Sequence, residues 1–89
     1  MTRNELDEFA DTVEEKILVA DGFDDAIIGL VYDFGVYRVA YDKAKMIAVL
    51  TEGDEPMSES EAIEFLEFNT FSAWVGEGSP IYVDTDLTY

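Results

Sequence analysis

The sequence from residue 26 to residue 41, AIIGLVYDFGVYRVAY, contains two apolar runs separated by a short turn with Gly35. β-Branched and aromatic residues dominate both runs, and a short glycine-containing connection between such runs is typical of a β-hairpin. The first run is almost continuously apolar, which favours a place in the middle of a sheet. Gly29 within it predicts a bulge or a close approach by another element.

The segment before the hairpin, residues 2–20, has the pattern of an amphipathic helix. Thr2 and Glu5 have the spacing of a capping box, and Asp21-Gly22 supplies a stop signal. Apolar residues recur at steps of three and four and form one stripe: Leu6, Phe9, Ala10, Val13, Ile17 and Ala20.

Two further helices and a strand are predicted after the hairpin. Asp42 is a candidate N-cap for a helix that ends near Thr51, and Ser58 with Glu61 forms a second capping box. The helix that Ser58 opens is expected to place Ala62, Phe65, Leu66 and Asn69 on one side. Residues 69–78 are expected to be irregular, residues 81–83 to form a short strand, and residues 84–89 to form a tail.

This order predicts one small α+β domain over residues 1–89, with the elements α-β-β-α-α-β. The second and third strands are joined through two helices, so they can lie parallel with a right-handed crossover. We expect a three-stranded sheet in the order 2-1-3 with the helices packed on one face.

The composition limits the possible functions. The chain has 21 Asp and Glu residues against five Lys and Arg, a formal charge of −16, and no His or Cys. Such a surface repels nucleic acid and anionic membranes and attracts basic proteins, including those that bind nucleic acid. Without His and Cys, the chain lacks the usual general base, the thiolate nucleophile and the best transition-metal ligands. We therefore expect a binding protein that is not an enzyme and has no cofactor. The start of the sequence does not resemble a signal peptide, so a cytoplasmic location is expected.

Rows of carboxylates are the strongest candidate site. Residues three or four apart on a helix have Cβ atoms about 5–6 Å apart, so such a row can imitate the phosphates of a DNA strand for a protein that binds DNA. The simpler interpretation is the solvated face of an amphipathic helix. The scarcity of interleaved Lys and Arg weakens it, because ordinary helices pair opposite charges at four-residue steps. The predicted partner-binding carboxylates are Glu52, Asp54, Glu55, Glu61, Glu64 and Glu67.

Metal and catalytic roles for the other carboxylates are less favoured. Asp21, Asp24 and Asp25, or the acidic residues of 52–55, could gather a hard cation such as Ca²⁺, but neither stretch has the spacing of a calcium loop. Asp33 and Asp42 flank the second strand and are better explained by turn and cap roles. We predict no metal site and no catalytic residue.

Trp74 is the only tryptophan and precedes Gly76-Glu77-Gly78. A single Trp in a small domain is most often a core anchor, whereas an exposed one beside flexible glycines would be a binding hot spot. We favour a core position for Trp74, and we keep it among the candidate partner-binding residues for the case in which it is exposed.

Several segments resemble a family of small uncharacterised acidic bacteriophage proteins. The resemblance rests on residues 22–29 (GFDDAIIG), 41–42 (YD), 67–69 (EFN) and 73–81 (AWVGEGSPI). It covers about two-thirds of the chain and excludes the first helix. It implies an accessory protein made in the cytoplasm of an infected bacterial cell, and it implies no reaction and no catalytic residues.

The sequence thus favours an acidic protein that binds a basic host or phage protein, as a nucleic-acid mimic or inhibitor. A self-associating structural or regulatory dimer and a small-molecule-binding protein remain alternatives, with the charge serving solubility or adaptation to high salt.

Overall fold

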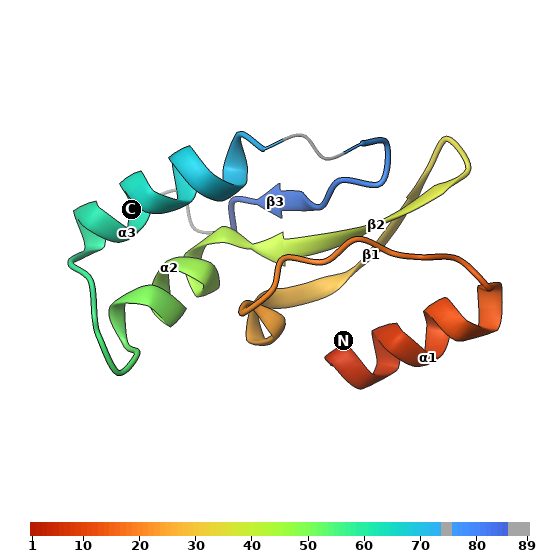
Figure 1. Cartoon of the computed structure of the whole chain (residues 1–89), viewed down its shortest axis with the longest axis horizontal. Coiled ribbons are helices and arrows are strands. Elements are labelled where there is room, and N and C mark those ends of the chain that lie inside the picture. Colours follow the sequence, from red (N-terminus) through yellow and green to blue (C-terminus); the bar gives the residue numbers. More distant parts are fainter. Residues whose placement is uncertain (74–75, 86–89) are drawn as a thin grey trace.

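A three-stranded mixed sheet forms the centre of the computed structural model, which describes residues 1–73 and 76–85 (Figure 1). The predicted α+β class and the order of the helices and strands are confirmed. The elements are α1 (Arg3–Val13), η1 (Asp24–Ala26), β1 (Ile27–Asp33), β2 (Val36–Asp42), α2 (Lys43–Thr51), α3 (Glu59–Leu66), η2 (Glu67–Phe71) and β3 (Ile81–Val83).

The predicted strand order 2-1-3 is wrong, because the sheet has the order β1-β2-β3. Strand β2 lies in the middle, antiparallel to β1 and parallel to β3. The apolar run of β1 lies at an edge, where Ile28 and Tyr32 are 46% and 65% exposed. Arg38 does not exclude β2 from the centre, because its Nε atom donates a hydrogen bond of 2.7 Å to the Ser79 carbonyl, just before β3. Arg38 thus links the central strand β2 to the segment that precedes β3.

The predicted hairpin between β1 and β2 is confirmed, and so is the bulge at Gly29. The pairing register shifts between Ile27 and Gly29, as expected for one extra residue in β1. The turn consists of Phe34 and Gly35, with φ angles of 51° and 78°. Both residues are in the left-handed region, which matches the twist of a two-residue hairpin.

Helix α1 begins as predicted and ends seven residues early. Thr2 and Glu5 form the capping box, and the pKa of Glu5 is lowered by its hydrogen bonds with the Thr2 backbone and side chain. The helix ends at Val13, with Glu14 in the left-handed conformation. Its last turn has no basic residue, while acidic side chains follow at the negative end of the helix dipole. Residues 15–20 instead run as an irregular segment beside the sheet (Figure 1).

The caps of α2 and α3 agree with the sequence. The Asp42 side chain accepts a hydrogen bond from the Lys45 backbone N–H, which places the start of α2 at Lys43. Ser58 and Glu61 form the second capping box, with each side chain accepting from the other residue's backbone N–H. Residues 69–78 were expected to be irregular, and this is wrong at their start, because residues 67–71 form a short π-helix that continues α3.

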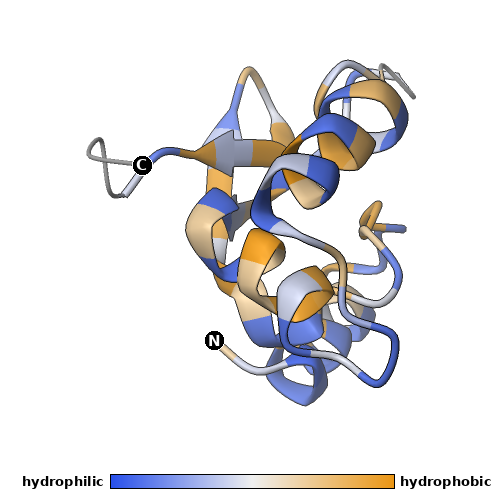
Figure 2. Ribbon diagram, turned by 90° about the vertical axis from the view of Figure 1, so that its left-hand side faces the viewer, coloured by the Kyte–Doolittle hydropathy of each residue, from blue (hydrophilic) through white to orange (hydrophobic). Residues whose placement is uncertain are grey.

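One core joins all three helices to the sheet face that carries Val39 and Tyr41. The buried residues include at least one side chain from each of α1, α2 and α3: Leu6, Phe23, Ala26, Ile27, Val39, Tyr41, Met46, Ile47, Ala62 and Leu66. In Figure 2, hydrophobic and hydrophilic residues alternate around the helices, as expected when each helix buries only one side.

No helix in residues 1–73 and 76–85 combines the length and apolarity that a membrane crossing requires. The start of the predicted tail contacts the rest of the fold: Asp84 forms an ion pair of 3.1 Å with Lys43, and the Thr85 hydroxyl donates to Asp42 at 2.8 Å. Trp74 and residues 86–89 lie outside the described residues.

Candidate protein-binding surface

Helix α3 presents a stripe of carboxylate and aromatic side chains to solvent. Ala62 and Leu66, four residues apart, are fully buried and turn the opposite side of the helix outward. Glu61 and Phe65 are one turn apart on that outer side, as are Glu64 and Phe68. The structure therefore mixes acidic and aromatic groups in one row.

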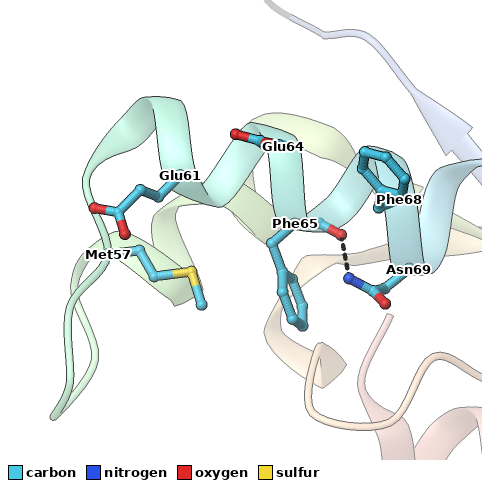
Figure 3. A pocket seen from close by; sticks show the side chains of 6 residues that line it. All are labelled: Met57, Glu61, Glu64, Phe65, Phe68 and Asn69. Carbon is cyan, nitrogen blue, oxygen red and sulfur yellow. Dashed lines mark hydrogen bonds between the residues drawn. The ribbon is translucent and has the colours of Figure 1, made fainter.

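A shallow depression of about 370 Å³ follows this stripe. We call it the α3 depression, and its lining residues are Met57, Glu61, Glu64, Phe65, Phe68 and Asn69 (Figure 3). The side chains of Met57 and Phe65 extend to the same side of the helix in Figure 3. The Asn69 amide donates a hydrogen bond of 2.9 Å to the Phe65 carbonyl and so is fixed at the edge of the depression.

Two of the predicted site residues, Glu61 and Glu64, come together in the α3 depression. Glu67 is exposed nearby but does not line it. Glu52 lines a separate depression of about 400 Å³ with Lys45 and Asp25, so it is not part of the α3 depression. Asp54 and Glu55 are exposed in the loop that connects α2 to α3. Trp74, the remaining predicted residue, is outside the described residues.

The two aromatic residues of this surface were not among the predicted site residues. Phe65 was expected on the same side of the helix as Ala62 and Leu66. This expectation is wrong, because Ala62 and Leu66 are buried, whereas Phe65 is 41% exposed. Phe68 is 81% exposed. Asn69 is also exposed. The spacing in the sequence contains the signal: Phe65 and Phe68 each follow a glutamate by four residues, which places them in the carboxylate row.

The surface around α3 carries negative charge with no cation from its own half of the chain. No Lys or Arg follows Lys45 in the sequence, whereas ten acidic residues do: Glu52, Asp54, Glu55, Glu59, Glu61, Glu64, Glu67, Glu77, Asp84 and Asp86. Among residues 1–73 and 76–85, no ion pair involves a carboxylate between positions 52 and 67. This part of the surface is thus open to an external cation.

The fixed cations lie elsewhere. Arg3 contacts Asp7 and Asp24 at 3.1 and 3.2 Å, and these hydrogen bonds raise the pKa of Arg3. Arg38 approaches Asp33 at 4.0 Å. Within the described part of the chain, no three carboxylates gather closely enough to hold a metal ion.

No family model, no curated protein and no solved structure matches this chain.

Proposed function

We propose that this protein binds a basic protein through the α3 depression and the acidic residues around it, without catalysing a reaction. The observation that carries the proposal is the row of exposed carboxylates on α3 beside two exposed phenylalanines, in a half of the chain that has no cation. An uncompensated charge of one sign attracts a surface of the other sign and speeds its association. Exposed aromatic side chains supply the apolar contact area that charge alone lacks.

A nucleic-acid-binding protein is the partner class that fits this charge best. Such proteins present clustered Lys and Arg side chains to phosphates. Carboxylates at helical spacing can form ion pairs with the same Lys and Arg side chains in place of the phosphates. Mimicry of a phosphate backbone is therefore the specific form of the proposal. The resemblance to acidic phage proteins, together with this charge, favours a host protein as the target and inhibition as the result.

The first experiment compares two variants with equal charge changes. Tagged wild-type protein, E64K/E67K on α3 and E8K/D11K on α1 are incubated with bacterial lysate and washed at low and then high salt. Both variants replace exposed glutamate or aspartate residues three apart. We expect a nucleic-acid-binding protein to be retained by wild type and E8K/D11K, released at high salt, and lost from E64K/E67K. Equal loss from both variants would contradict the α3 assignment, and so would the absence of any salt-sensitive partner.

Self-association is the second candidate, because Phe65 on α3 and Phe68 on η2, which continues α3, are both exposed. The two candidates respond to salt in opposite directions. Two copies repel each other, each with a formal charge of −16, so screening strengthens a dimer and weakens a complex with a basic partner. Sedimentation of the pure protein at about 0.05 and about 0.5 M NaCl distinguishes them.

A further inference from the structure

The fold already contains one site in which a cation is held between an aromatic ring and a carboxylate. The Lys43 Nζ atom lies 4.9 Å from the centroid of the Phe71 ring and 3.1 Å from the Asp84 carboxylate. The negative face of the ring and the charge of the carboxylate both attract the ammonium group. Side chains from α2, η2 and the segment after β3 build this site.

The α3 depression also combines an aromatic ring with a carboxylate, although from other residues. Phe68 is 81% exposed, and Glu64 lies one helical turn before it and lines the same depression. Glu61 also lines it, although one of its carboxylate oxygens accepts the hydrogen bond from Ser58 that caps α3. All six lining residues are acidic, apolar or amide-bearing, so the cation that would complete the arrangement must come from outside.

We infer that the α3 depression binds an arginine side chain of the basic partner, with the guanidinium stacked on the Phe68 ring and paired with the Glu64 carboxylate. This inference rests on the proposed function and adds the side chain that is recognised. Arginine fits better than lysine, because its planar, weakly hydrated guanidinium can stack on a ring and at the same time donate two hydrogen bonds to a carboxylate.

A second copy of this chain does not supply the arginine. Both of its arginines are engaged, Arg3 with Asp7 and Asp24, and Arg38 with Asp33 and the Ser79 carbonyl. The charge of −16 on each copy also opposes the approach. The occupant is therefore a basic segment of a different protein.

The test measures the affinity of two labelled peptides of equal length and charge, one alternating Arg and Ala and the other alternating Lys and Ala. Fluorescence anisotropy gives the dissociation constant for wild type and for F68L, which keeps an apolar side chain and removes the ring. The control is F34L, because Phe34 is 99% exposed but lies outside the α3 depression. E64Q and its α1 control E8Q isolate the carboxylate.

We expect wild type to bind the Arg peptide more tightly than the Lys peptide. F68L should weaken binding of the Arg peptide about two- to fivefold and remove the preference for Arg, the effect of losing one cation–π contact at an exposed site. E64Q should weaken both peptides, while F34L and E8Q should bind the Arg peptide as wild type does.

The possible failures can be told apart. If E64Q weakens binding and F68L does not, the stacking inference is overturned and the acidic surface of the proposed function stands. If E64Q and E8Q weaken binding equally, only net charge matters. This result would overturn both the stacking inference and the proposed function. Because Phe68 and Glu64 are exposed, neither substitution should unfold the protein.

Discussion

The hydroxyl of Tyr41 accepts a hydrogen bond of 2.8 Å from the backbone N–H of Ala20. Tyr41 is fully buried in the central strand β2, while Ala20 belongs to the irregular segment that connects α1 to η1. The bond therefore attaches that segment to the middle of the sheet. It also gives a buried phenol the partner that it requires.

Replacement of Tyr41 by Phe should lower the free energy of unfolding by about 1 kcal/mol. The substitution keeps the ring in the core and leaves the Ala20 N–H without its acceptor. Urea denaturation at neutral pH measures the loss. The matched control is Y32F. The Tyr32 side chain is 65% exposed, so removal of its hydroxyl should change the free energy of unfolding little. Equal stability of Y41F and wild type would contradict this role for the hydroxyl.

Stability should fall as the pH rises above about 10, the ordinary pKa of tyrosine. Burial raises the pKa of Tyr41 and of Tyr82, because both phenolates lose solvation in the fold. The unfolded chain therefore releases these protons first, so the stabilisation is complete below about pH 10 and is lost as the pH passes through the higher pKa values of the folded state. Urea denaturation from about pH 9 to about pH 11 measures the decline. Y41F should show a shallower decline than wild type, and parallel curves would contradict the assignment.

Replacement of Phe34 by Asn should stabilise the protein by about 0.5–1 kcal/mol. Phe34 has a φ of 51° and is 99% exposed, so it occupies a left-handed conformation and gains no compensating burial. A bulky residue is strained in this region, whereas Asn followed by Gly is the preferred pair for such a turn. Thermal denaturation measures the gain. F34L is the control, since Leu removes the ring without relieving the backbone, and an equal gain in F34L would refute the explanation.

The melting temperature should rise with added NaCl. A formal charge of −16 on one small domain causes repulsion that salt screens. A thermal melt at a series of NaCl concentrations up to about 0.5 M tests this. E64K/E67K, with less negative charge, should show a smaller rise. A flat or falling response would mean that the charges are already well spaced, and unfolding below molar salt would instead support adaptation to a saline environment.

Local features of the fold could be predicted where neighbouring residues decide them. The capping boxes at Thr2 and Ser58 and the N-cap at Asp42 depend on side chains within three or four positions of the backbone groups that they satisfy. The turn at Gly35 depends on a residue that adopts a positive φ without strain. The end of α1 was harder to predict, because an apolar stripe continues past Val13. The tertiary contact between Ala20 and Tyr41 competes with helix continuation there.

The candidate site was predictable in its charge and not in its composition. Glu61 and Glu64 were identified from their spacing, whereas Phe65 was grouped on one side of the helix with Ala62 and Leu66, which are buried. Which side of α3 is buried depends on how Ala62 and Leu66 join the core cluster, which also contains residues of α1, α2 and β2. That contact between distant elements determines whether an aromatic side chain fills the core or faces solvent.

By itself, the sequence determined the chemical character of the protein: its negative charge, the absence of His and Cys, the helix starts and the hairpin. Only the tertiary structure decided that β2 lies between β1 and β3, and that Phe65 and Phe68 lie beside Glu61 and Glu64 at the surface. The reason is the range of the interactions. Caps and turns depend on interactions between residues a few positions apart in the sequence. Strand order and burial depend on contacts between residues far apart in the sequence, such as that of Arg38 with Ser79.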